Sequence, residues 1–492
     1  MGLLDKIKKR AGDASGQPSA SAQGVASGEK KNRVMVIGLD CAPPRHIFDE
    51  YAGDIPNLTK LRENGVWGPL DSIVPPITVP AWMCMMTSKD PGTLGIYGFR
   101  NRKDHTYDGL SFVTSWAIKE PTVWDILSKE GKDSIIMSVP PSYPPKELKG
   151  VQIGCFLTPN DEADYTYPKE LKAELRENAG EYIFDMRNFR TDNTQYILDE
   201  SYKMTEARFK NANYLLANKP WDFFMMVEMG PDRLNHGIWS FIDPDHPRYE
   251  PDNPFQESLR DYYRYLDGKI GELLTKYADD RTTVLVVSDH GAKAMVGGVC
   301  FNEWLHNEGY LGFEDELPDE VTPINKMEID WSKTKAWGDG GYYGRLFLNV
   351  EGREPNGIIP QAEYEKVRQE LIDKIESMVD HEGVPMGNKA LKPEELYTSN
   401  NGVAPDLIVI FGELRWRSVG SLGHDAIYTF ENDTGPDEAN HAEQGIFIMN
   451  NAPGQEAGSR EGLHLWDVHC TILDLFGLEP AQGALGKSAL ES

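Results

Sequence analysis

The sequence is poor in three features, and each shortage excludes a class of protein. Its five cysteines are odd in number and never spaced as CxxC, which argues against a disulfide framework and against a thiolate zinc site. No stretch approaches the roughly 18 to 20 uninterrupted apolar residues of a membrane helix, so we expect no transmembrane segment.

Basic residues are also few. There are 50 Lys and Arg residues against 78 Asp and Glu residues, for a net charge of -28. A surface this acidic repels long phosphate polymers, so we expect no long nucleic acid partner. A small phosphate ester remains compatible, because it would meet local metal charge rather than the field of the whole surface.

The first 31 residues differ from the rest in composition. MGLLDKIKKR lacks the apolar core of a signal peptide, which favours a cytoplasmic location. It is followed by a Ser/Gly/Ala-rich stretch typical of a flexible linker. We predict a flexible tail over residues 1–31; a short basic helix that docks on a partner or a membrane surface is the alternative.

From residue 32 onward, apolar runs alternate with helical stretches. The strand-like runs lie at 33–40, 133–139, 221–229, 282–289, 405–412 and 444–450. Helical patterns lie between them, near 56–65, 196–217, 256–277 and 361–379. This alternation predicts an α/β fold with a mostly parallel central sheet and helices on both faces. We interpret 32–492 as one catalytic domain, in which the loop-rich segment 292–440 is an insertion or cap.

Metal-ligand residue types end three of these runs. Asp40 ends the first run, Asp289 and His290 end the run at 282–289, and Asp232 and His236 follow the run at 221–229. Sites in open parallel sheets form beyond the carboxyl ends of the strands, so these side chains are expected on one rim. On a helical turn Asp232 and His236, spaced i, i+4, would share a face and chelate one ion. Taken singly, each acidic residue is as easily a helix cap, a turn former or part of a surface pair.

Thr78 is the candidate nucleophile. The segment after it, VPAWMCMMTS, predicts a helix with Pro80 in its first turn. From local sequence alone, Thr78 would more often be a helix N-cap. A catalytic role needs a bound cation that lowers the hydroxyl pKa, with the helix N-terminus adding positive potential for a phosphate.

As a set, these segments resemble the alkaline phosphatase superfamily, and most closely its type I phosphodiesterase/nucleotide pyrophosphatase branch. The matching pieces are VMVIGLD, ITVPAWMCMMTSKDPGTLGIYGF, MGPDRLNHG, VVSDHG and NHAEQG, in the family's order. The resemblance implies an alkaline-phosphatase-like fold and two divalent metal ions about 4 Å apart, Zn²⁺ in preference to Mn²⁺. It also implies that Thr78 attacks phosphorus and forms a covalent phosphothreonine. The implied ligands are Asp40, Thr78, Asp289 and His290 for one ion, and Asp232, His236 and His441 for the other.

The sequence departs from the family where substrate would be held. About 20 residues after the nucleophile, where nucleotide pyrophosphatases usually carry an asparagine, stand Gly98 and Phe99, with Asn101 close by. Nucleotide specificity therefore stays open. The candidate substrate-binding residues are Asn101, Arg100, Trp82 and Tyr97, with Arg102 as a further possible phosphate clamp. We expect the aromatic residues of 292–440, namely Trp337, Tyr342, Tyr343 and Trp416, to serve mainly in packing.

The leading interpretation is hydrolysis of a phosphodiester or pyrophosphate bond in a small phosphate ester, a nucleotide being one possibility. A phosphomonoesterase, or a phosphotransferase like the cofactor-independent phosphoglycerate mutases, is the alternative enzyme. A protein that kept the fold only for binding is the third interpretation. The complete set of candidate ligands with a nucleophile argues against it.

Overall fold

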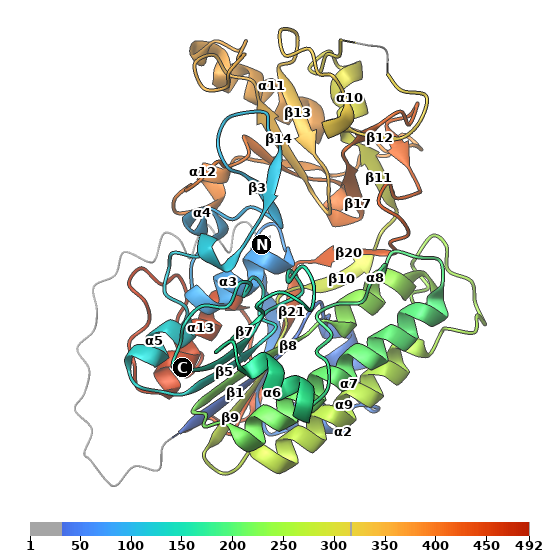
Figure 1. Cartoon of the computed structure of the whole chain (residues 1–492). Coiled ribbons are helices and arrows are strands. Elements are labelled where there is room, and N and C mark those ends of the chain that lie inside the picture. Colours follow the sequence, from blue (N-terminus) through green and yellow to red (C-terminus); the bar gives the residue numbers. More distant parts are fainter. Residues whose placement is uncertain (1–31, 315–316, 492) are drawn as a thin grey trace.

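The computed structural model describes residues 32–314 and 317–491, so the predicted tail lies outside the described residues. A ten-stranded sheet forms the lower part of the molecule (Figure 1). Its five parallel strands are, in spatial order, β9 (Thr282–Val287), β1 (Arg33–Leu39), β8 (Phe223–Glu228), β5 (Ser134–Met137) and β6 (Gly150–Ile153). The remaining strands lie at the two edges: β21 (Gln444–Asn450), β2 (Gly65–Asp71), β22 (Gly458–Ser459), β23 (Leu463–His464) and β7 (Thr166–Tyr167).

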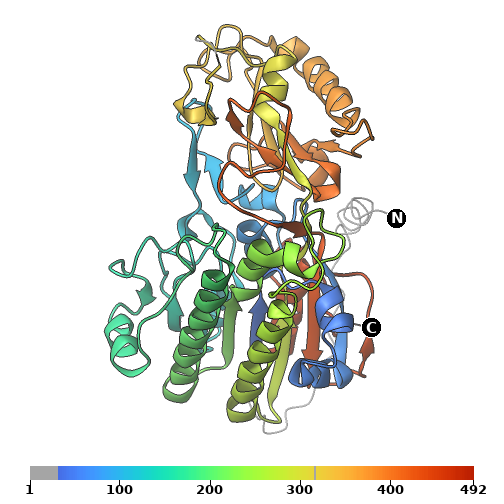
Figure 2. The ribbon, with the colours of Figure 1, turned by 90° about the vertical axis from the view of Figure 1, so that its right-hand side faces the viewer.

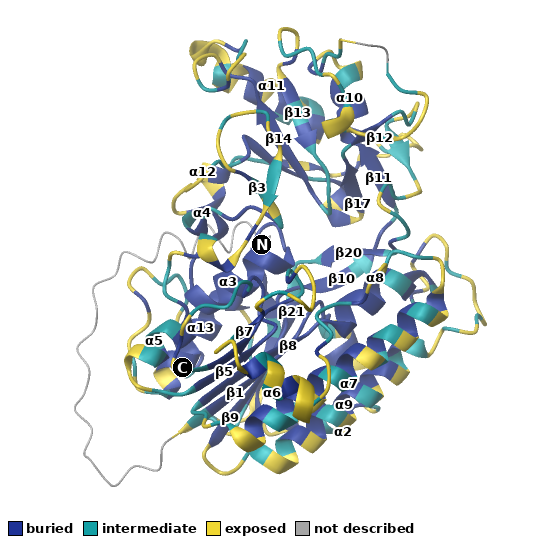
Figure 3. Cartoon of the chain, viewed as in Figure 1, coloured by how far each residue is buried: buried dark blue, intermediate teal, exposed yellow. Residues whose placement is uncertain are grey.

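Helices cover both faces of this sheet, as the fold-class prediction required. Alternate residues of a strand point to opposite faces, so Val34 and Val36 enter one core while Met35 and Ile37 enter the other. The first core is closed by α3 (Thr78–Thr87), α5 (Val123–Lys129) and α13 (Leu465–Leu475). The second is closed by α2 (Pro56–Glu63), α7 (Thr194–Asn218), α8 (Gly230–Ile242) and α9 (Ser258–Tyr277). The strands are buried, and α7 and α9 carry exposed residues on their outer sides (Figure 3).

A second body, which we call the upper lobe and define as residues 297–429, sits above the carboxyl ends of the parallel strands (Figures 1 and 2). It has its own apolar core around an antiparallel sheet of β13 (Ala336–Asp339), β14 (Gly344–Leu348), β16 (Leu407–Ile410) and β15 (Lys389–Leu391). Its helices are α10 (Phe301–Asn307), α11 (Tyr364–Glu376) and α12 (Pro393–Leu396). Its remaining strands are β11 (Gly297–Cys300), β12 (Thr322–Pro323), β17 (Trp416–Val419), β18 (Ser421–Leu422) and β19 (Tyr428–Thr429).

Two strand-like runs behave differently from the parallel strands that they resemble in sequence. The run at 405–412 forms β16 of the upper lobe and does not join the central sheet. The run at 444–450 joins the central sheet as β21 but pairs antiparallel with β9 and β2. An apolar run specifies burial, and it does not specify which sheet buries it or in which direction.

Shorter elements complete the fold. They are α4 (Pro91–Leu94), α6 (Leu171–Asn178), β3 (Arg100–Arg102), β4 (Leu110–Phe112), β10 (Gly291–Ala294) and β20 (Ala439–Ala442), with the single turns η1 (Arg45–Glu50), η2 (Ser115–Ala117), η3 (Ile324–Lys326), η4 (Gln361–Glu363) and η5 (Gly412–Leu414). All five cysteines are buried free thiols. Within the part of the chain that the structure describes, no helix combines the length and apolar character needed to span a bilayer.

Candidate metal centre

The candidate metal ligands lie at one rim of the central sheet, below the upper lobe. Asp40 follows β1, and Asp289 and His290 follow β9. Because β1, β8 and β9 are parallel neighbours, their carboxyl ends meet at the same edge. The rim faces β10 and β20, which run between the sheet and the upper lobe (Figure 1).

Asp40 is fixed by a residue from a different element. The indole Nε1 of Trp82, on α3, donates to Asp40 Oδ2 at 2.8 Å. Trp82 can come this close because β1 carries glycine at position 38, where a Cβ atom would lie 2.5 Å from the indole ring. The next residue, Cys41, takes the left-handed conformation at φ 59, and its amide donates to Asp289 Oδ1 at 3.2 Å. Strain of this kind is stored where the surrounding structure imposes it, often at functional sites.

Asp232 and His236 stand one turn apart on α8, as the i, i+4 spacing predicted. Asp232 Oδ1 lies 3.3 Å from His236 Nε2, and both residues are buried. The other oxygen of Asp232 accepts from Arg233, which is itself held by Asp185. The helix therefore presents one free carboxylate oxygen and one ring nitrogen to the rim.

His441 reaches the same point through pairing of β20 with β10, in which it stands opposite Ala292. Gly291 precedes Ala292, and a Cβ atom at this glycine would lie 2.4 Å from the carbonyl oxygen of Gln444. The glycine after His290 thus permits a close strand approach. The ring of His290 stacks on that of His441 with centroids 3.8 Å apart.

The hydrogen bonds of the rings leave one nitrogen of each histidine directed into the site. His441 Nδ1 donates to the carbonyl of Pro76 at 2.9 Å, and His290 Nδ1 lies 3.1 Å from the carbonyl of Gly291. A ring whose Nδ1 carries the proton offers the lone pair of Nε2, which is the form that binds metals. The Nε2 atoms of His236 and His441 lie 3.2 Å apart.

Two overlapping groups of these side chains have the spacing of a metal site. One consists of Asp232, His236 and His441, and the other of Asp40, Asp232 and His290. In each group the potential ligand atoms lie within 4.8 Å of one another. The carboxylate of Asp232 belongs to both groups, so the two sites adjoin.

The potential ligand atoms are arranged to bind a cation, because several of them lack a hydrogen-bond partner within the described part of the chain. One oxygen each of Asp40, Asp232 and Asp289 is buried without a hydrogen-bond partner among the described residues. These oxygens face histidine Nε2 atoms at 3.8, 3.3 and 3.1 Å, respectively. A buried carboxylate left unpaired is costly, and a bound cation removes that cost. Carboxylate oxygens with imidazole nitrogens form the ligand set of zinc and similar divalent ions.

The pKa values of these side chains reflect how closely the buried charged groups are packed. Burial, followed by the charges of Asp289 and Asp232, raises the pKa of Asp40 well above its ordinary value. Burial alone would lower the pKa of His236, but the carboxylates of Asp437 and Asp232 raise it to about 9. Burial and the neighbouring imidazoles His290 and His236 hold the pKa of His441 well below its ordinary value. Several carboxylates in one buried space hinder each other's ionisation unless a positive charge lies between them.

Thr78 is the first residue of α3, and the preceding Ile77 occupies the N-cap position without a side-chain bond. The N-cap alternative for Thr78 is therefore wrong. Its hydroxyl instead lies 3.1 Å from His290 Nε2, inside the cluster of donors. A helix N-terminus directs free backbone N–H groups and a positive dipole end at this point, where an anionic phosphate would be stabilised.

Sequence reasoning missed the residues behind the histidines. Asp437 Oδ1 accepts from His236 Nδ1 at 2.8 Å, and Arg190 pairs with Asp437 Oδ2 at 3.1 Å. Tyr342, which we expected to serve mainly in packing, packs on a candidate ligand: its ring stacks on that of His236 with centroids 4.9 Å apart. Asp437 stands four residues before His441, and this acidic residue near a candidate ligand was the one available signal. Arg190 lies in a loop with no recognisable pattern.

The residues expected to bind substrate are engaged elsewhere. Trp82 is entirely buried behind Asp40, and Tyr97 is 2% exposed with its hydroxyl donating to the carbonyl of Asn401. Asn101 closes its own turn, accepting from Tyr97 N at 2.7 Å and donating to the carbonyl of Gly98 at 3.0 Å. Arg100 is about half-exposed on β3, 4.0 Å from Asp339.

Arg102 does not form a phosphate clamp either. It is buried against the rings of Trp337 and Phe347 and pairs with Glu354 at 3.4 Å.

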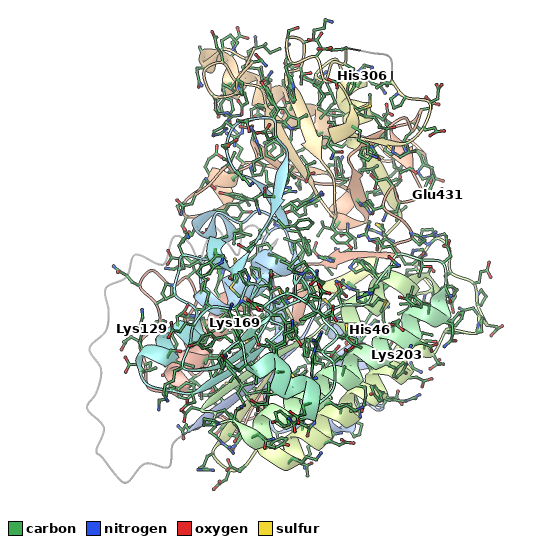
Figure 4. The ribbon with its side chains drawn as sticks, in the orientation of Figure 1. His46, Lys129, Lys169, Lys203, His306 and Glu431 are labelled. Atoms are coloured by element: carbon green, nitrogen blue, oxygen red, sulfur yellow. The ribbon has the colours of Figure 1, made fainter. Side chains whose placement is uncertain are left out.

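Histidines outside the cluster have structural surroundings. His46, labelled in the lower part of Figure 4, is buried and stacks on Tyr51 with centroids 4.7 Å apart. His306, labelled in the upper lobe, lies with Nδ1 2.9 Å from the carbonyl of Leu311.

Comparisons with known proteins give the family and the fold of the chain. No curated protein matches the sequence. Solved structures of ectonucleotide pyrophosphatase/phosphodiesterase 5 share the fold. A murine structure, of an inactive threonine-to-alanine variant in complex with AMP, has 14% identity and a TM-score of 0.55 over 91% of this chain and 96% of that chain. A human structure has 13% identity and a TM-score of 0.54 over 93% of this chain and 97% of that chain.

The sequence also matches the profile of type I phosphodiesterases/nucleotide pyrophosphatases over residues 34–437. The chain therefore belongs to the type I phosphodiesterase/nucleotide pyrophosphatase family, and is a hydrolase of that metal-dependent group.

Proposed function

We propose that this protein hydrolyses a phosphodiester or pyrophosphate bond of a small ester, a nucleotide among the candidates, with Thr78 as the nucleophile. One observation carries the proposal. The Thr78 hydroxyl lies 3.1 Å from His290 Nε2, where three buried carboxylates each direct an unpartnered oxygen. The murine relative supports it, because its inactive form is a threonine-to-alanine variant and was solved with AMP.

We assign the ligands to two adjoining divalent ions, with Zn²⁺ preferred to Mn²⁺. Asp40, Thr78, Asp289 and His290 would hold one ion. Asp232, His236 and His441 would hold the other. Asp232 belongs to both candidate groups, so its carboxylate also lies within reach of the ion that we assign to Asp40, Thr78, Asp289 and His290. The mixture of nitrogen and oxygen donors is the reason to prefer zinc.

When bound, the ions would neutralise the carboxylates, lower the pKa of the threonine hydroxyl and stabilise charge on the phosphate oxygens. The chain supplies the rest. The α3 N-terminus would orient the phosphate with its backbone N–H groups. Thr78 Oγ1 then gives up its proton and forms a bond to phosphorus, while the bond between phosphorus and the leaving oxygen breaks and that oxygen takes up a proton. Water cleaves the resulting phosphothreonine and restores the hydroxyl.

The test is hydrolysis by protein reconstituted with Zn²⁺ or Mn²⁺, offered a chromogenic phosphodiester and the matching monoester. We expect the diester to be preferred and Thr78→Ala to lose on the order of 10³-fold or more in kcat. Thr78→Ser keeps a hydroxyl and should retain part of the activity. Thr87→Ala, which removes a hydroxyl from the other end of α3, is the matched control.

Acid-quenched wild-type protein should contain phosphorylated Thr78 by mass spectrometry, and metal analysis should give two ions per chain. Full activity in Thr78→Ala would refute the covalent route. A preference for the monoester, or isomerisation of a phosphosugar acid without hydrolysis, would favour the alternative enzymes.

A further inference from the structure

Arg417 is a buried cation whose hydrogen-bonding capacity is largely unused. It lies on β17 of the upper lobe and is 5% exposed. Its Nε and Nη1 atoms are buried without a hydrogen-bond partner among the described residues. Leaving charged donors unsatisfied in the interior is costly, so their presence calls for an acceptor.

The position of Arg417 follows from strand pairing. Gly341 and Ser418 form an antiparallel bridge with reciprocal backbone hydrogen bonds of 2.8 and 2.9 Å. In such a bridge the residue after Gly341 faces the residue before Ser418, so Tyr342 stands opposite Arg417. Tyr342 in turn stacks on His236 and lies with its ring centroid 4.3 Å from that of His441. Arg417 is thus separated from the metal centre by one aromatic side chain.

The neighbouring charges do not use these donors. Arg190 is matched by Asp437 at 3.1 Å and also donates to the hydroxyl of Tyr342. Arg417 faces Asp433 at 3.6 Å, but only through Nη2, and Asp433 accepts a hydrogen bond from Ser421. A structural ion pair with Asp433 therefore accounts for one atom of the guanidinium and leaves Nε and Nη1 unexplained. Burial, and then the charge of Arg190, lowers the pKa of the Arg417 guanidinium. A bound anion would oppose both effects.

The order of contacts gives the direction in which this anion would lie. Thr78 contacts His290, His290 stacks on His441, and Tyr342 packs against His441 in turn. In an in-line displacement the leaving oxygen departs opposite the nucleophile. With Thr78 as the nucleophile, we infer that Arg417, which stands opposite Tyr342, is on the leaving-group side of the scissile phosphorus.

We propose that Nε and Nη1 of Arg417 form an anion-binding subsite for a carboxylate or phosphate carried on the leaving group of the substrate. Two adjacent N–H donors of a guanidinium match the paired oxygens of either group. The assignment to the leaving-group side rests on Thr78 as the proposed nucleophile, whereas the existence of the subsite does not.

Binding of phosphinates tests the subsite without any turnover, because they contain no ester bond. The probes are benzyl(methyl)phosphinate and its 4-carboxy and 4-phosphono derivatives, titrated calorimetrically into Zn²⁺-loaded protein. We expect an anionic derivative to bind wild type on the order of tenfold more tightly than the parent compound. Arg417→Met should abolish this preference, whereas Arg415→Met, which removes an exposed arginine two residues away, should retain it.

Tighter binding of the carboxylate alone or of the phosphonate alone supports the subsite and identifies its ligand. Equal binding of all three probes to wild type would overturn it, as would a preference that survives in Arg417→Met. If circular dichroism shows that Arg417→Met does not fold, Arg417→Lys provides the test. One ammonium group cannot replace the two adjacent N–H donors of the guanidinium. The preference should then fall, and an unchanged preference would overturn the proposal. Failure of the proposed hydrolysis would instead appear as an inactive wild type in the diester assay.

Discussion

Replacing Asp437 with asparagine should weaken metal binding without moving the histidine that it supports. Asp437 Oδ1 accepts from His236 Nδ1 at 2.8 Å, and the pair is fully buried. Asparagine has the same size and its carbonyl oxygen can accept the same hydrogen bond, so the substitution removes charge and keeps shape. A carboxylate behind a ligating histidine fixes its tautomer and raises its basicity.

Two independent routes give the same magnitude for this loss. Removing such a supporting carboxylate typically costs 10- to 100-fold in metal affinity, or about 1.4 to 2.8 kcal/mol. A hydrogen bond to a charged partner contributes about 1.5 to 3 kcal/mol. Asp437 also neutralises Arg190 at 3.1 Å, so the free energy of unfolding should fall as well. Because the Arg190 side chain is 22% exposed, we expect about 1 to 3 kcal/mol and not the larger cost of a fully buried unpaired charge.

The assay is competition for Zn²⁺ against a chromophoric chelator, with two binding steps resolved. The step assigned to His236 should weaken by one to two orders of magnitude in Asp437→Asn while the other step changes little. Asp433→Asn is the matched control, since this acidic residue lies near Arg417 and accepts from Ser421. Unchanged affinities in Asp437→Asn, or equal losses in both variants, would refute the reasoning.

Three further changes probe the same centre. Gly38→Ala puts a Cβ atom 2.5 Å from the Trp82 ring and should lower the free energy of unfolding in urea by about 1 to 3 kcal/mol. Gly53→Ala, where no atom lies within 4 Å of the added carbon, should change it little, and equal effects would contradict the steric argument. Trp82→Phe removes the 2.8 Å hydrogen bond to Asp40 and should cost about 1 to 3 kcal/mol of stability. It should also weaken Zn²⁺ binding in the chelator assay, and wild-type affinity would show that Asp40 needs no support. Removing the metal with a chelator should lower the Tm, because free Zn²⁺ at 1,000 times its Kd adds about 4 kcal/mol to the unfolding free energy. A Tm unaffected by chelation would argue against a metal in this buried site.

The sequence predicts the acidic and imidazole side chains of the rim well, for a physical reason. Asp40 and His290 directly follow buried parallel strands, and the topology of such sheets gathers the ends of neighbouring strands. Asp232 and His236 are recognisable because helical geometry fixes the relation between i and i+4. The prediction failed for Trp82, because nearness in sequence to Thr78 indicates nothing about which way an indole points.

The upper-lobe side of the centre is harder to predict, since it is assembled by long-range pairing. Tyr342 and Arg417 are 75 positions apart in sequence and meet through the bridge between Gly341 and Ser418. Neither position carries a motif, and no hydrophobic period specifies that pairing. Asp437 is similar, because its role depends on where α8 places His236.

We expect the rim residues to determine the reaction and the upper-lobe residues to determine which leaving group is preferred. The proposed nucleophile and most of the candidate ligands are fixed by the central sheet and the helices that begin at its rim, and His441 by β20. Tyr342 and Arg417 come from the upper lobe, where Tyr342 stacks on His236 and Arg417 stands opposite Tyr342. We therefore expect a substitution at Arg417 to change which ester is accepted while the donors for the ions stay in place. Sequences that share the rim residues but differ at position 417 should share the reaction and differ in the leaving group they prefer.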